Sequence, residues 1–164
     1  MSISVVRVDD RVIHGQTMTR WTKARPVDGI LVVGDNIAHD KLRRKVLKAA
    51  ANELKVGIYT VAEAGEKIAK GIESKKKFFL ISDSPQTFAK LVDLGVDFGK
   101  VLNVGPMNTR PGTKVLGRTV ALDQNDYDAF EDIARHGVEI QFQLLPDDEP
   151  KSWTTMKKKY DEMK

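Results

Sequence analysis

Short runs of β-branched and other apolar residues recur along the whole chain, and segments with helical spacing of apolar residues lie between most of them. Continuous apolar runs of this length indicate strands that are buried on both faces. Such strands, joined by crossover helices, predict an α/β fold with an open, mostly parallel twisted sheet of about seven strands and helices on both faces. The predicted strands cover residues 3–8, 30–33, 56–59, 78–81, 101–104, 115–122 and 138–145.

Helix start signals support this alternation. Thr60-Val-Ala-Glu63 has the form of a capping box, and Ser84 precedes a proline suited to a first helical position. The segment 115–122 has Gly117 in its middle, so a tight hairpin with an antiparallel strand is the alternative there. Further helices are predicted over residues 15–23, 40–51, 123–136 and 152–160, with N-caps at Asp40, Asp123 and Ser152.

We expect a single domain over residues 1–164, because no linker, repeat or low-complexity segment divides the chain. Apolar residues make up 41% of the sequence and charged residues 30%, which is typical of a folded domain rather than a disordered chain. The absence of cysteine excludes disulfides, thiolate nucleophiles and thiolate metal ligands. No long apolar leader or membrane-spanning run is visible, so the sequence predicts a cytoplasmic protein.

The end of the first predicted strand and the loop after it contain an unusually large number of charged and polar residues. Ligands of open α/β sheets gather at the carboxyl ends of the strands, which is where this loop begins. Imidazole titrates near pH 6.5, so His14 is largely neutral at pH 7 and can attack a phosphorus atom without a separate base. The sequence therefore predicts a phosphoryl carrier. The polar residues of this segment are Arg7, Asp9, Asp10, Arg11, His14 and Gln16.

Phosphoryl transfer needs donors where the negative charge of the group resides. Arg7 and Arg11 supply such donors, and a helix beginning near Gly15 adds backbone N–H groups. Either Asp9 or Asp10 can hold the imidazole tautomer. A structural alternative stays open, in which the histidine packs at the helix start and the arginines pair with the aspartates.

The segment Arg7-Val-Asp-Asp-Arg-Val-Ile-His-Gly-Gln16, with Trp21 shortly after it, resembles the phosphorylation-site loop of a known family. That family is the IIB component of the mannose/fructose/sorbose family of sugar phosphotransferase systems. The resemblance continues in order through residues 32–36, 102–107 and 141–146. It implies that His14 is phosphorylated by a IIA phosphohistidine and passes the group to sugar entering through the membrane IIC and IID components.

The same resemblance implies that Arg7 and Arg11 surround the phosphoryl group. It also implies a peripheral association with the inner face of the cell membrane through the transporter, while a homodimer stays open. Pro106 stands where the family pattern has glycine, which removes one N–H donor from that loop. The candidate phosphate-binding residues are Gly15, Gln16, Asp35, Asn36, Asn103 and Gly105.

Other polar positions favour structural roles. The segment 34–39 is also typical of a helix-entry turn, and His39 beside Asp40 is expected to be exposed or structural. His136 before Gly137 predicts a helix C-terminus with a left-handed cap. Core packing is favoured for Trp21. Arg110-Pro-Gly112 with Lys114 suits an anion site or a plain turn equally. No histidine pair has metal-ligand spacing, so we expect neither a metal nor a cofactor.

Three rival functions can be weighed on sequence grounds. A receiver domain would need an acceptor aspartate after the third strand, where Tyr59-Thr60 stands instead. A nucleotide or nucleic-acid module suits the net charge of +4, but no P-loop or G-x-G-x-x-G follows a strand and aromatics are only 7%. The basic runs at 41–48, 75–77 and 157–159 favour solvated helix faces. A histidine-dependent phosphatase, with an aspartate activating water, stays open.

Overall fold

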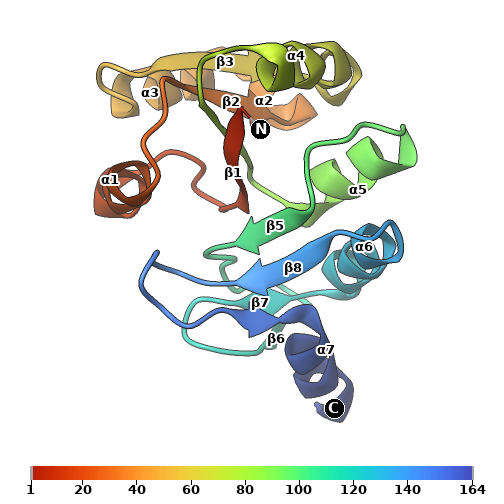
Figure 1. Cartoon of the computed structure of the whole chain (residues 1–164). Coiled ribbons are helices and arrows are strands. Elements are labelled where there is room, and N and C mark those ends of the chain that lie inside the picture. Colours follow the sequence, from red (N-terminus) through yellow and green to blue (C-terminus); the bar gives the residue numbers. More distant parts are fainter. Residues whose placement is uncertain (1, 164) are drawn as a thin grey trace.

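The computed structural model describes residues 2–163, apart from the side chains of Gln16 and Thr17. The main sheet has seven strands in the order β3-β2-β4-β1-β5-β8-β9 (Figure 1). All neighbours pair in parallel except β9, which is antiparallel to β8. A separate antiparallel pair is formed by β6 and β7. The strands are β1 (Ile3–Val8), β2 (Gly29–Val33), β3 (Lys55–Tyr59), β4 (Phe78–Ser82), β5 (Val101–Val104), β6 (Lys114–Val115), β7 (Ala121–Leu122), β8 (Glu139–Phe142) and β9 (Lys151–Ser152).

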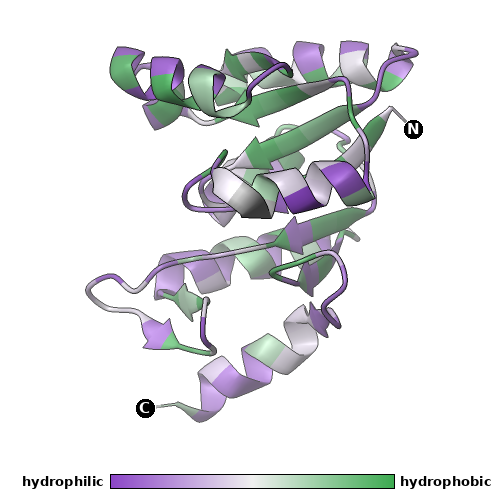
Figure 2. Cartoon of the chain, turned by 90° about the vertical axis from the view of Figure 1, so that its left-hand side faces the viewer, coloured by the Kyte–Doolittle hydropathy of each residue, from purple (hydrophilic) through white to green (hydrophobic). Residues whose placement is uncertain are grey.

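Helices cover both faces of this sheet. One apolar cluster joins the sheet to α1 (Gly15–Ala24), α2 (Asp35–Ala38) and α3 (Lys41–Ala50). A second cluster joins the opposite face to α4 (Val61–Glu73), α5 (Pro85–Asp93), α6 (Gln124–Arg135) and α7 (Trp153–Glu162). Figure 1 shows α1 and α3 on the left of the sheet and α4, α5 and α6 on the right. The strands are mostly hydrophobic and the helices mixed, as Figure 2 shows, which agrees with the predicted α/β class.

The predicted helix starts are largely confirmed. In four helices the N-cap side chain accepts a hydrogen bond from the backbone N–H three residues later, and these caps are Asp40, Thr60, Asp123 and Ser152. Thr60 and Glu63 complete the predicted capping box. Ser84 makes no capping bond through its side chain, although Pro85 opens α5 as predicted.

Four elements differ from the sequence predictions. Residues 114–122 form the antiparallel hairpin of β6 and β7, which confirms the alternative predicted for 115–122, but this hairpin lies outside the main sheet. The antiparallel strand of the main sheet is instead β9, where only a helix start was expected. Residues 34–39 contain the short helix α2 rather than a simple turn. The strand predicted over 138–145 ends at Phe142, because the carbonyls of Gln143 and Leu144 accept hydrogen bonds from Arg7.

The centre of the sheet determines where the predicted site lies. β1 pairs with β4 on one side and β5 on the other. The chain leaves β1 for α1 on one face, whereas it leaves β4 for α5 on the opposite face. Such a divergence of neighbouring connections opens a crevice at the carboxyl edge of an α/β sheet. The loop that carries His14 therefore begins at the position where this fold places ligands.

Candidate functional site

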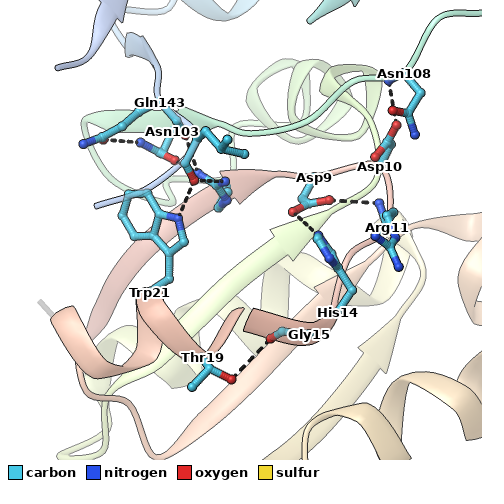
Figure 3. Close-up of polar contacts among 12 residues, drawn as sticks. Asp9, Asp10, Arg11, His14, Gly15, Thr19, Trp21, Asn103, Asn108 and Gln143 are labelled. Atoms are coloured by element: carbon cyan, nitrogen blue, oxygen red, sulfur yellow. Dashed lines mark hydrogen bonds and ion pairs between the residues drawn. The ribbon is translucent and has the colours of Figure 1, made fainter. Parts of the chain in front are cut away.

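His14 and Asp9 form the central pair of the loop (Figure 3). The Nε2–H of His14 donates to Asp9 Oδ2 at 2.9 Å, and the second carboxylate oxygen accepts the backbone N–H of Arg11 at 2.9 Å. Asp9 is only 2% exposed, so its carboxylate is held in one orientation. Of the two aspartates proposed as orienters, Asp9 is the one that contacts the imidazole. Among the described residues, no hydrogen bond uses Nδ1 of His14.

The backbone of the loop brings His14 to the beginning of α1. His14 occupies the N-cap position, but its side chain makes no capping hydrogen bond, so the N–H groups of the first turn are free of a side-chain cap. Val12 is buried with φ of 62°, an unusual conformation for a β-branched residue. Gly15 has φ of 36°, which glycine tolerates. Strain of this kind is common where a loop must present a functional group.

Arg7 lies under the loop rather than on its surface. The side chain is 1% exposed, and its guanidinium donates to the carbonyls of Gln143 and Leu144, at 2.8 Å each, and to the amide oxygen of Asn103. It also lies 4.6 Å from the ring centroid of Trp21. Burial lowers the pKa of Arg7 to about 10, so the group stays charged at pH 7. The guanidinium of Arg7 therefore donates its hydrogen bonds to acceptors within the protein itself.

Asn103 and Gly105 are brought together around Arg7. The side-chain amide of Asn103 donates to Gln143 Oε1 at 2.9 Å while its oxygen accepts from Arg7. A Cβ atom at Gly105 would overlap the Arg7 guanidinium, so this glycine is required by close approach rather than by φ. We name Arg7, Trp21, Asn103, Gly105 and the Gln143–Leu144 carbonyls the Arg7 frame. Sequence reasoning missed Gln143 and Leu144 as members, although the family resemblance covered their segment.

Trp21 confirms the core-packing prediction. It is 4% exposed, and its indole N–H donates to the carbonyl of Leu144 at 2.9 Å. The same carbonyl accepts from Arg7. Trp21 thereby connects α1 to the segment after β8, and the loop between β1 and α1 is anchored at both ends.

Asp10 links the loop to the segment after β5. Its Oδ2 accepts the N–H of Asn108 at 2.7 Å, and its own N–H donates to the carbonyl of Pro106 at 3.0 Å. Burial raises the pKa of Asp10, partly opposed by the Asn108 hydrogen bond. Its other oxygen, Oδ1, is buried and has no hydrogen-bond partner among the described residues. Asp10 is thus a clamp between two loops, while Pro106 contributes its carbonyl.

Arg11 lies on the surface of the loop. It is exposed, and among the described residues no hydrogen bond or ion pair uses its guanidinium. Gln16, another predicted phosphate ligand, has its backbone in α1, but its side chain lies outside the described part of the structure. The candidate anion-binding groups beside His14 are consequently Arg11 and the first-turn N–H groups of α1.

Asp35 and Asn36 lie at the end of β2, which is separated from β1 by β4. Both are exposed, and Asp35 Oδ1 accepts the N–H of Val61 at the start of α4 at 2.9 Å. No hydrogen bond or ion pair between the described residues connects either of them to His14. They remain predicted ligands with a visible structural role for Asp35.

The other predicted positions have local roles. His39 is exposed, as expected. His136 is the C-cap of α6, and Gly137 has φ of 84°, so the predicted helix end is confirmed. Arg110 donates to the buried Asp126 at 2.6 Å, which favours the structural reading of its segment. One group of possible metal ligands lies among the described residues, formed by Asp93, Asp132 and His136 within 4.8 Å of one another.

None of the helices in residues 2–163 combines the length and the apolar character needed to cross a membrane.

The chain is similar to a known protein family. The model of the "PTS system sorbose subfamily IIB component" family matches residues 3–164.

Two curated relatives match over most of their length. The fructose-specific EIIB component of Bacillus subtilis (strain 168) is 33% identical over 153 residues, which cover 90% of this chain and 91% of the relative. The sorbose-specific EIIB component of Klebsiella pneumoniae is 32% identical over 149 residues, 90% of each chain. The mannose-specific EIIAB component of Escherichia coli (strain K12) is 32% identical over 149 residues, but the match covers only 46% of that longer protein.

Solved structures agree. The IIBSor domain of the sorbose permease from Klebsiella pneumoniae superimposes with a TM-score of 0.88 at 30% identity, covering 96% of this chain and 97% of that one. The N-acetylgalactosamine-specific IIB component 1 from Escherichia coli gives a TM-score of 0.84 at 31% identity, with 91% and 97% covered. The similarity therefore includes the whole sheet and the loop that carries His14.

Proposed function

The chain belongs to the IIB components of the mannose/sorbose family of the phosphotransferase system, and we propose that His14 is the residue that carries its phosphoryl group. A IIB component is a protein-Nπ-phosphohistidine–sugar phosphotransferase and acts as a phosphoryl carrier in sugar transport. The observation that supports His14 is its hydrogen bond to the buried Asp9 at the carboxyl edge of β1.

The hydrogen bond to Asp9 also indicates which nitrogen reacts. With Nε2–H donating to the carboxylate, the lone pair of the neutral ring lies on Nδ1. We propose that Nδ1 attacks the phosphorus atom of a donor phosphohistidine, so that one P–N bond forms as the other breaks. Asp9 then faces a ring that gains positive character, and its negative charge stabilises the phosphorylated form.

The negative charge on the transferred phosphoryl group must be stabilised by hydrogen-bond donors on the solvent-facing side of the loop. Arg11 has a free guanidinium there, and the first-turn N–H groups of α1 have no side-chain cap. We propose that Arg7 positions the loop and does not contact the phosphoryl group, since its hydrogen bonds hold the segment after β8 beneath the loop. No step of this transfer requires a metal or a cofactor.

The family implies a IIA phosphoryl donor and a membrane IIC/IID transporter as partners. We propose that the donor phosphohistidine meets His14 at the carboxyl edge of the sheet, and that His14 then delivers the group to sugar at the transporter. We propose accordingly that the protein works in the cytoplasm, beside the inner face of the cell membrane. The relatives are named for fructose, sorbose, mannose and N-acetylgalactosamine, so the sugar varies within the family.

Intact-mass analysis tests the carrier role. Wild type and His14→Gln are incubated with phosphoenolpyruvate, the general phosphotransferase proteins and a mannose-family IIA of proven activity. An acid-labile phosphoryl adduct on wild type alone is the expected result. An adduct that persists in His14→Gln would move the site, and no adduct on wild type would overturn the proposal. Rapid loss of the adduct to water in the absence of transporter would favour the phosphatase alternative.

A further inference from the structure

The solvent side of α3 combines positive charge with exposed apolar side chains. Five of the ten residues of α3 are lysine or arginine, and none is acidic. Leu47 faces the core, whereas Leu42 is 73% exposed and Val46 is 57% exposed. Leu42 is the most exposed of the large apolar side chains in the described part of the chain. A protruding leucine and valine in a basic helix are not explained by packing within this domain.

These residues form one continuous surface. Leu42 and Val46 are four residues apart and therefore neighbours on one side of the helix. Lys41, Lys45 and Lys48 are also exposed, and they follow one another at spacings of four and three residues beside them. We call these five residues the α3 patch.

The cations of the α3 patch make neither an ion pair nor a side-chain hydrogen bond within residues 2–163, in contrast to the two arginines of the same helix. Arg43 pairs with Asp83 at 3.1 Å, and Arg44 donates to the carbonyl of Ala38 at 2.9 Å. The arginines thus hold the helix to the fold. The three lysines contribute nothing comparable, so they are available to an external anion.

The acidic residues of the opposite face are mostly paired. Helix α6, in the cluster that lies across the sheet from α3, contains four acidic residues and one arginine. Three of these carboxylates pair with cations: Asp126 with Arg110, Glu131 with Lys157 and Asp132 with Arg135. The lysines of the α3 patch have no such partner within residues 2–163, so this side of the molecule is the one that an anionic surface attracts.

We propose that the α3 patch binds the anionic inner leaflet of the membrane directly, with Leu42 and Val46 entering the headgroup region and the lysines contacting lipid phosphates. This inference rests on the proposed function, which brings the chain to a membrane transporter. A cytoplasmic loop of that transporter is the less suitable occupant, because such loops carry an excess of lysine and arginine that would repel the patch. Basic helices with exposed aliphatic side chains bind anionic bilayers in this way.

This orientation leaves the phosphoryl site open. The helix α3 packs beside β3 at one end of the sheet (Figure 1), whereas His14 follows β1 near the middle of the sheet. A molecule held at this end keeps His14 free to approach a transporter in the plane of the membrane. Reversible binding of the patch would raise the local concentration of the carrier near its acceptor without covering the site.

Vesicle sedimentation tests the proposal with the full chain and no partner protein. We expect wild type to bind vesicles that contain phosphatidylglycerol and to dissociate from them at high salt. It should not bind vesicles of phosphatidylcholine alone. Lys41→Gln/Lys45→Gln/Lys48→Gln should lower the partition coefficient by roughly 100-fold, and Leu42→Gln should lower it by several-fold. A matched control, Lys75→Gln/Lys76→Gln/Lys158→Gln, removes the same charge from exposed positions elsewhere and should change it by about twofold at most.

Three outcomes would overturn the proposal. The first is that wild type shows no preference for anionic vesicles. The second is that the control variant loses binding as much as the patch variant. The third is that the patch variant binds vesicles normally but is phosphorylated more slowly by IIA in solution, which would assign the patch to an acidic protein. Phosphorylation of His14 is measured separately, so a failure of the carrier role would remain distinct from a failure of lipid binding.

Discussion

Arg7 and Arg11 stand four residues apart in one motif, yet they lie in two different environments. Arg7 belongs to β1 in the middle of the sheet, opposite Ile81 and Asn103, so its side chain is enclosed beneath α1. Arg11 follows the end of the strand, where the turn from Asp9 to Val12 points it to solvent. The same residue type is thus buried beneath the loop in one case and exposed on its surface in the other.

The motif that contains Arg7 and Arg11 therefore has a buried part and a part for which we propose a role in phosphoryl transfer. The buried part is the Arg7 frame. The guanidinium of Arg7, on β1, donates hydrogen bonds to β5 and to the segment after β8, and it lies over the Trp21 ring of α1. The part that we propose to take part in the transfer consists of His14, Asp9 and Arg11. We expect substitutions in the first part to alter stability and those in the second to alter the rate of transfer.

The largest effect is expected from Arg7→Ala. It removes the donors to Asn103 Oδ1 and to two carbonyls and leaves a cavity beside Trp21. The free energy of unfolding should fall by about 3–5 kcal/mol, measured by urea denaturation. Arg7→Lys keeps the charge but lacks the forked donors, so it should recover only part of the loss. A variant Arg7→Ala with wild-type stability and slow transfer would instead place Arg7 at the phosphoryl group.

Arg11→Gln should show the opposite behaviour. Loss of one preorganised charge at the transferred group should slow phosphorylation of His14 by about 100-fold, while stability changes by about 0.5 kcal/mol or less because the side chain is exposed. The rate is followed by rapid-quench measurement with IIA as donor. Arg118→Gln, at another exposed arginine, serves as the control. Normal transfer by Arg11→Gln would show that the α1 N–H groups suffice.

The fold and the place of the site follow from local patterns, but the Arg7 frame does not. The apolar runs predict the strands, and the strand end at Val8 predicts a loop at the carboxyl edge. The burial of Arg7 depends on partners 96 and 136 residues later in the chain. Strand and helix periodicity carries no information on contacts at such separations. The family resemblance covers both segments but does not reveal the contacts with Arg7, and phosphate binding by Asn103 and Gly105 stays a prediction.

Gly105→Ala tests whether glycine is needed at this position because of the close approach of the Arg7 side chain. A methyl group there would overlap the Arg7 guanidinium, so we expect a loss of about 1–3 kcal/mol in the free energy of unfolding. In an Arg7→Ala background the same substitution should cost little, since the overlapping group is gone. A double-mutant cycle by urea denaturation measures this coupling. Additive losses would mean that Gly105 is required for another reason.

The smallest effect concerns Asp10, the clamp between the two loops. Burial raises its pKa above the ordinary value, so the folded protein binds this proton more tightly than the unfolded chain does. The raised pKa therefore adds stability at low pH that is lost as the pH rises through the folded pKa.

Asp10→Asn keeps an acceptor for the Asn108 N–H but has no proton to lose. Its stability relative to wild type should therefore increase with pH, by less than about 1 kcal/mol because Asp10 is partly exposed. Urea denaturation from about pH 4 to about pH 8 measures the difference, with Glu149→Gln as an exposed acidic control. If the difference between Asp10→Asn and wild type stays constant with pH, the Asp10 carboxylate is not desolvated, and the clamp acts through its hydrogen bonds alone.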